Sequence, residues 1–141
     1  MKRTIAAMLL FVFVLSISVM GANVPPDSPD ASYYISSYSA KVINGGNGNL
    51  KVSFDVTGTS TMTRLGASAI SIYRSTGSYV TSIYYFSAGR SAMMGSNTIY
   101  HSDVETIHVG AGSYYAVVTF FAQNSSGSDT KTYQTGVRVI T

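Results

Sequence analysis

The stretch from Gly110 to Gly127, a glycine turn followed by a β-rich run and a polar hairpin loop, constrains the fold of this chain more than any other. It is rich in β-branched and aromatic residues, which suit a pleated strand and disfavour a helix. Strand side chains alternate between two faces, and neither face of this run is polar. We therefore predict a central strand, or one whose outer face is covered. One face holds Tyr114, Ala116, Val118, Phe120 and Ala122, and the other holds Tyr115, Val117, Thr119, Phe121 and Gln123.

Segments before and after this run have the lengths and turn signals of short strands. Residues 50–57 alternate without exception, so their apolar side chains are predicted to face inward. Residues 44–49 are Asn and Gly alone, which predicts a hairpin turn with positive φ angles. The inward set of the first segment is Leu50, Val52, Phe54 and Val56. Further strands are predicted at residues 33–43, 69–74, 79–86, 97–109 (one strand or two) and 130–140, with connections at 58–66 and 87–96.

The same alternation predicts which residues of these segments reach the core. Ile70 and Ile72 are expected to face inward, with Ser71 and Tyr73 outward. The connections are expected to return Met62 and Leu65 to the core and to fill a core gap with Met93 and Met94. In the last segment the inward residues are predicted to be Val137 and Val139. Roughly seven or eight strands with frequent turns predict an all-β antiparallel sandwich.

The first residues have the pattern of a secretory signal peptide. Lys2 and Arg3 precede an apolar run over residues 5–20, shorter than the roughly 20 residues that a membrane-spanning helix needs. Small residues then favour cleavage after Gly21, with Ala22 as a weaker alternative. An uncleaved anchor is the competing interpretation. We expect a signal peptide at residues 1–21, an extended leader at 22–32, a folded domain at 33–141, and secretion of the mature chain without membrane insertion.

Composition restricts the partners and the source of stability. Without Lys2 and Arg3, seven basic residues face six acidic ones, so the apparent basicity implies no nucleic-acid or anionic-membrane partner. The chain contains no cysteine, so neither disulfides nor a lipid-modified cysteine is available. A secreted domain of this length must therefore be stabilised by burial alone, which fits a bacterial protein better than a eukaryotic one.

Two short motifs resemble known β-sandwich families. Residues 110–116 resemble the corner before strand F of immunoglobulin-like domains: Tyr114 matches the corner tyrosine, and Ala116 stands where that family has a cysteine. Residues 122–128 are similar to a loop of fibronectin type III domains. The resemblance implies an immunoglobulin-like antiparallel β-sandwich of seven or eight strands, a bonded Tyr114 hydroxyl, and Ala116 facing Val52 or Phe54. The chain also resembles small secreted sandwich proteins of Gram-positive bacteria.

Catalytic and metal-binding chemistry has few candidate residues. A serine nucleophile would need His101 or His108 as its base, and no Gly-x-Ser-x-Gly motif is present. His101, Asp103 and Glu105 share one face if residues 97–109 form a continuous strand, as metal ligands would, with His108 nearby. A polar sandwich edge is the interpretation we favour. We expect no enzyme activity, no cofactor and no metal.

Tyrosine is the unusual feature of the composition. Eleven tyrosines and no tryptophan occur in the chain, and tyrosine suits binding surfaces because it offers large area with few rotamers. Ordinary strand preference explains the same count equally well. The predicted binding surface is the outward set Tyr73, Tyr115, Val117 and Phe121. We expect a secreted, non-catalytic module that binds a protein or glycan surface outside the cell or self-associates as a homo-oligomer; a toxin or bacteriocin-like effector and a small hydrolase are the alternatives.

Overall fold

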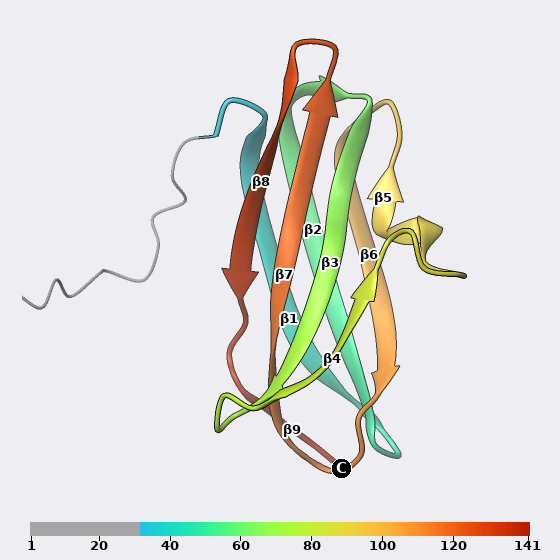
Figure 1. Ribbon diagram of the computed structural model, residues 1–141, viewed down its shortest axis with the longest axis vertical. Helices are drawn as coiled ribbons and strands as arrows, with labels where there is room; N and C mark the ends of the chain where they lie inside the picture. The colour runs from blue at the N-terminus through green and yellow to red at the C-terminus, as the bar shows by residue number, and fades with distance from the viewer. Residues whose placement is uncertain (1–31) are drawn as a thin grey trace, which may run out of the picture.

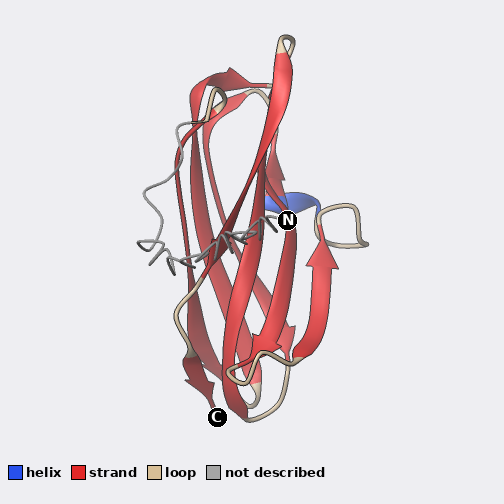
Figure 2. Cartoon of the chain, turned by 60° about the vertical axis from the view of Figure 1, so that its left-hand side comes forward, coloured by secondary structure: helices blue, strands red, loops and turns tan. Residues whose placement is uncertain are grey.

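The computed structural model describes residues 32–141, so the predicted signal peptide and residues 22–31 of the leader lie outside the described residues. Two antiparallel sheets pack face to face, which confirms the predicted sandwich (Figures 1 and 2). The described residues form nine strands and one 3-10 turn, and no helix among them is long and apolar enough to cross a bilayer. The elements are β1 Ile35–Gly46, β2 Asn49–Met62, β3 Arg64–Arg74, β4 Tyr79–Tyr84, η1 Ser91–Met93, β5 Met94–Gly95, β6 Thr98–His108, β7 Gly112–Asn124, β8 Gly127–Gln134 and β9 Arg138–Ile140.

The smaller sheet has the strand order β1-β2-β6, and the larger sheet has the order β4-β3-β7-β8. Two short strands extend the larger sheet: β5 pairs with β3, and β9 pairs with β7. Strand β7 is therefore paired on both sides along its length, as its two apolar faces predict.

The core lies between the sheets and follows the predicted alternation. Leu50, Val52, Phe54 and Val56 are buried on β2, and the five residues from Tyr114 to Ala122 that share a face are buried on β7. Across the core the rings of Phe54 and Phe120 meet at 6.1 Å in an edge-to-face arrangement. Each fully buried side chain of this size contributes roughly 1.5–3 kcal/mol. Hydrophobic burial thus supplies the cohesion that a cysteine-free domain requires.

Tyr114 links the start of β7 to the preceding loop. Its ring is fully buried, and its hydroxyl donates to the carbonyl oxygen of Val109 at 2.9 Å and approaches that of Ala111 at 3.4 Å. The guanidinium carbon of Arg74 lies 5.3 Å from the ring centroid. The bonded hydroxyl expected from the corner resemblance is therefore present. Ala116, two residues later, is also fully buried.

The predicted turn at residues 44–49 joins β1 to β2. Gly46, Asn47 and Gly48 all have positive φ, between 52° and 75°, which glycine and asparagine tolerate best. Gly48 accepts amide hydrogen bonds from Val109 and Gly110 at its carbonyl and donates to Thr141 at 2.9 Å. This hairpin therefore ties the β6–β7 connection and the last residue together at one end of the sandwich.

One predicted connection is wrong. Residues 58–66 were predicted as a connection, but β2 runs to Met62 and β3 begins at Arg64, although Met62 and Leu65 are buried as predicted. Residues 97–109, for which one strand or two was predicted, contain the single strand β6, Thr98–His108. Backbone pairing between neighbouring strands of each sheet thus extends into polar segments whose sequence resembles that of a loop.

The predicted last strand is also divided, and its inward residues are misassigned. Thr135 interrupts it: the Ala116 amide donates to the Thr135 hydroxyl at 3.0 Å, and the Thr135 amide donates to the Ala116 carbonyl at 2.9 Å. The chain turns there from β8 to β9, so the alternation restarts. Val137 and Val139 are consequently 56% and 59% exposed, and Ile140 is the buried residue.

The connection between β4 and β6 folds back over the sandwich edge. It contains η1 and β5, and Met93 is fully buried, as the predicted gap-filling role requires. The ladder of β5 with β3 brings the main chain at Met93 against Gly66, where an added Cβ would lie 2.1 Å from the Met93 carbonyl oxygen. A glycine is therefore needed at residue 66 for this close approach.

Candidate binding face

The outer face of the larger sheet carries a row of three tyrosines at one end. We call it the tyrosine row: Tyr79 of β4, Tyr73 of β3 and Tyr115 of β7. Tyr73 is the ladder partner of both others. The rings of Tyr73 and Tyr115 stack with centroids 5.3 Å apart and an 11° angle between planes, and Tyr79 meets Tyr73 edge to face at 5.7 Å. Tyr79 is exposed and the other two are half-buried. Three neighbouring strands thus present one aromatic strip.

The opposite end of the same face carries an arginine held by aromatic rings. We call this the Arg64 cluster: Arg64 with Tyr85 and Phe121. The guanidinium carbon of Arg64 lies 4.7 Å from the Tyr85 ring centroid and 5.6 Å from that of Phe121. These distances are within the range of cation–π attraction. Beside the cluster, Tyr84 and the exposed Phe86 stack at 5.2 Å.

Small and hydroxyl-bearing residues occupy the face between these two ends. Ser71 and Ser82 are ladder partners on β3 and β4, and their hydroxyls hydrogen-bond at 2.7 Å. Val117 pairs opposite Ser71 on β7. In the next rung Ala69 pairs with Thr119, which pairs in turn with Thr132 of β8. The middle of the face is therefore low in bulk and rich in hydroxyl groups.

The outer face of the smaller sheet has a different chemistry. Its central strand β2 presents Lys51, Ser53 and Asp55, and the Ser39 hydroxyl of β1 donates to the Asp55 carboxylate at 2.6 Å. Tyr100 of β6 is the exposed aromatic residue opposite Thr57. This face has the ordinary mixture of a solvated sheet, so the aromatic character of the molecule's surface is concentrated on the larger sheet.

The structure places the four predicted binding residues on one face, but they do not all contact one another. Tyr73 and Tyr115 stack, Val117 follows on the same face, and Phe121 lies in the Arg64 cluster at the far end. All four are half-buried. Arg64, which was predicted to lie in a polar connection, and Tyr79 also belong to this face, although neither is among the predicted binding residues.

Tyr79 was missed because β4 contains an irregularity. Thr81 pairs with Ile72, whereas Tyr79 pairs with Tyr73, so the strand gains one residue at Val80. Strict alternation would place Tyr79 on the core side with Thr81 and Ile83. The extra residue turns it outward beside Tyr73, and no local sequence signal indicates that change.

The predicted metal candidates lie elsewhere, on the inner side of β6. His101, Asp103 and Glu105 share a face, as the continuous strand requires, and they pair with β2 opposite Val56, Phe54 and Val52. The fourth candidate, His108, has the opposite parity, is exposed, and lies 3.3 Å from the Asn49 side-chain oxygen. Within residues 32–141 no group of three or more ligand-type side chains could hold a metal ion.

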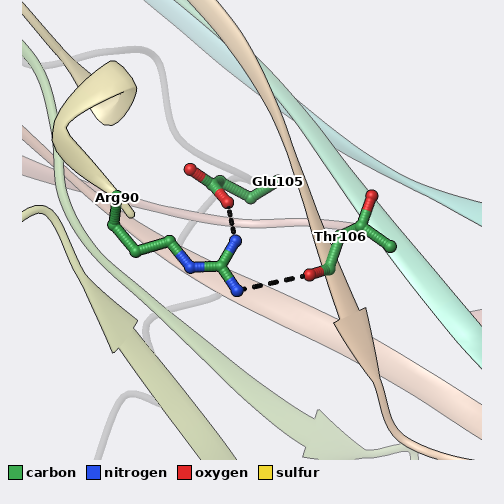
Figure 3. Close-up of polar contacts among 3 residues, drawn as sticks. All are labelled: Arg90, Glu105 and Thr106. Carbon is green, nitrogen blue, oxygen red and sulfur yellow. Dashed lines mark hydrogen bonds and ion pairs between the residues drawn. The ribbon is translucent and has the colours of Figure 1, made fainter. Parts of the chain in front are cut away.

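Two of these inner side chains, Glu105 and His101, instead bond to the connection that folds over them, whereas the buried Asp103 Oδ2 atom has no hydrogen-bond partner among the described residues. The Glu105 carboxylate pairs with the Arg90 guanidinium, which also donates to the Thr106 carbonyl at 3.5 Å (Figure 3). His101 lies with its Nε2 atom 2.8 Å from the Ala92 carbonyl oxygen. Burial raises the pKa of Glu105 above its ordinary value of 4.5, and the Asp103 carboxylate raises it further, while Arg90 opposes the rise. The cluster therefore anchors residues 90–93.

Comparison with known proteins adds no family to this description. No protein-family model, curated protein or solved structure matches the chain.

Proposed function

We propose that this chain is a secreted, non-catalytic binding module that contacts a protein or glycan surface outside the cell through the outer face of the larger sheet. The observation that carries the proposal is the tyrosine row, in which Tyr79, Tyr73 and Tyr115 form a continuous strip across three strands. Stacked rings lose little rotamer freedom on binding and offer large contact area. An aromatic surface of this extent on a soluble domain is typical of an interaction site.

Two further features support a role in binding rather than catalysis. The ring nitrogens of His101 and His108 lie within hydrogen-bond distance of a backbone carbonyl and an asparagine oxygen, and neither bonds to a serine hydroxyl of residues 32–141. The acidic side chains Asp103 and Glu105 face the interior of the sandwich, where Glu105 is paired with Arg90. Neither residue set lies on the aromatic face.

Secretion and the immunoglobulin-like character of the sandwich belong to the same proposal. The charged and apolar pattern of residues 1–21 supports export, and N-terminal sequencing of protein from the medium tests it, with Ala22 or Asn23 expected first. The Tyr114 corner, with its hydroxyl bonded to the Val109 carbonyl, supports an immunoglobulin-like arrangement.

Retention of the full chain on cell-wall fractions and immobilised host glycans tests the binding face. We expect the double variant Tyr73→Ser with Tyr115→Thr to remain folded and to lose roughly tenfold or more in retention, because both stacking surfaces are removed. Tyr100→Ser is the matched control, since Tyr100 is an exposed tyrosine on the opposite face. Sedimentation of the same proteins measures self-association through the same face.

The result that contradicts the proposal is equal retention, and equal sedimentation, of the wild type and the folded double variant. A loss of retention in Tyr100→Ser alone would instead place the contact on the smaller sheet.

A further inference from the structure

We call the outer face of the larger sheet, from the tyrosine row to the Arg64 cluster, the candidate face. Arg64 is the one charged side chain among the residues named on it. It begins β3 and is half-buried, and its guanidinium lies over the rings of Tyr85 and Phe121. Contact with two rings holds the planar group in place without using its five N–H donors, because cation–π attraction acts through the ring faces. The donors are therefore positioned before any ligand arrives.

No acceptor in the described part of the chain takes up these donors. Within residues 32–141 the Arg64 guanidinium has no hydrogen bond and no ion pair. Arg90 shows the alternative in the same molecule, since its guanidinium is matched by the Glu105 carboxylate and the Thr106 carbonyl (Figure 3). A half-buried guanidinium without an acceptor is a preformed site for a carboxylate, which it can bind through two parallel hydrogen bonds.

No carboxylate of residues 32–141 binds Arg64. Residues 32–141 contain four acidic side chains, and all have other places in the fold. Asp55 is bonded to Ser39 on the opposite face, and Asp129 is bonded to Ser32 and to the Thr130 amide. The other two, Asp103 and Glu105, lie on the inner side of β6. The candidate face thus has positive charge and no negative charge of its own.

The rest of the face favours sugar rings over a peptide as the carrier of that carboxylate. Strands β3 and β7 are each paired on both sides, so their backbone groups are not free to accept an added peptide strand. What the face offers is the stacked pair Tyr73 and Tyr115 and the hydroxyls of Ser71, Ser82 and Thr119. A sugar ring has an apolar face that can stack on a tyrosine and hydroxyl groups at its edge that can hydrogen-bond to serine and threonine, so it matches this combination. From Tyr115 to Phe121 the strand rises about 20 Å, enough for several sugar units.

Resting on the proposed function, we propose that the ligand is an acidic polysaccharide: the Arg64 guanidinium binds a sugar carboxylate, and the sugar chain follows β7 toward the stacked Tyr73 and Tyr115. Arg64 supplies charge selectivity at one end of the face, and the tyrosine row supplies ring stacking at the other.

Affinity electrophoresis of the full chain in gels containing polygalacturonate, or its fully methyl-esterified form, tests this inference. The two polymers share a backbone and differ only in whether the carboxylate is free. We expect the free acid to retard the protein about tenfold more strongly, and Arg64→Gln to abolish that difference. Lys41→Gln, which removes the same charge from the opposite sheet, is expected to behave as wild type. Arg64→Lys is expected to recover only part of the retardation, because a lysine lacks the planar fork.

Separate outcomes overturn the inference and the proposed function. Equal retardation by the two polymers, no retardation by either, or no effect of Arg64→Gln would overturn acidic-sugar binding. The retention of the Tyr73 and Tyr115 variants on cell-wall fractions tests the binding face independently of that result. Equal or stronger retardation by polyglutamate would identify an acidic protein segment as the ligand and reject the sugar. Retardation by dextran sulfate equal to that by polygalacturonate would show charge attraction without carboxylate recognition, and would also overturn it.

Discussion

The hydroxyl of Tyr114 donates a 2.9 Å hydrogen bond to the carbonyl oxygen of Val109, five residues earlier in the chain. The bond joins the start of β7 to the first residue of the β6–β7 connection. Because the Tyr114 ring is fully buried, this hydroxyl cannot exchange its partner for water without opening the core.

Tyr114→Phe is therefore expected to lower the free energy of unfolding by about 1–2 kcal/mol, because the variant removes the hydrogen bond that the fully buried Tyr114 side chain makes to the Val109 carbonyl. Urea denaturation measures the change. Tyr133→Phe is the control, since Tyr133 is exposed on β8. Equal midpoints for Tyr114→Phe and wild type would show that the hydroxyl bond contributes nothing to stability.

Gly66→Ala is expected to lower the free energy of unfolding by roughly 1–3 kcal/mol. The added methyl group would overlap the Met93 carbonyl oxygen, so β5 and the buried Met93 side chain must shift. Gly136→Ala is the matched control, because a Cβ at residue 136 meets no atom within 4 Å. Thermal denaturation of both variants measures the difference, and a loss of stability in Gly136→Ala alone would contradict the close approach.

The stacked rings of Tyr73 and Tyr115 are expected to be energetically coupled. A double-mutant cycle with Tyr73→Ala and Tyr115→Ala should give a coupling free energy of about 0.5–1 kcal/mol, the range of cross-strand aromatic pairs. Tyr115→Ala and Tyr100→Ala, on opposite sheets, should be additive within error. Additive effects for the first pair would show that the rings lie together without stabilising the sheet.

Sequence alternation predicts the interior of this fold well wherever a strand is regular. Residues 50–57 of β2 alternate between apolar and polar side chains, β7 keeps one regular parity from Tyr114 to Ala122, and every residue of these two inward faces is buried. Burial of one sheet face leaves only one acceptable register, because a shift by one residue would expose the whole set. The same reasoning identified Tyr73 and Tyr115 as outward neighbours, and they stack.

Prediction fails where a contact distant in sequence changes the local period. The additional residue at Val80 turns Tyr79 outward, and the hydrogen bonds of Thr135 to Ala116 restart the alternation before Ile140. Arg64 looks like a loop residue because its aromatic partners, Tyr85 and Phe121, come from other strands and connections. In each case the decisive partner is at least 19 residues away or on another strand, so a local pattern carries no trace of it.

The Glu105 carboxyl is expected to make stability depend on pH. Burial raises its pKa above the ordinary value of 4.5, so near that pH the folded chain binds more protons than the unfolded chain. Protonation therefore favours folding, and the contribution of Glu105 is fully present below pH 4.5 and is lost as the pH rises through the raised pKa. The contribution of Glu105 to the free energy of unfolding should therefore fall as the pH rises from 4.5 through the raised pKa.

Glu105→Gln, which keeps an oxygen near Arg90 but cannot ionise, is expected to flatten this part of the pH profile, as measured by urea denaturation at intervals from pH 4 upward. Arg90→Gln removes the group that opposes the rise, so Glu105 should then cost stability at neutral pH, by about 1–3 kcal/mol for a buried charge without its partner, and less at pH 4. Asp55→Asn on the opposite face is the control and should retain the slope that Glu105 contributes. Parallel profiles for wild type and Glu105→Gln would mean that the Glu105 carboxyl titrates alike in the folded and unfolded chains, and that its burial beside Asp103 is compensated fully by Arg90.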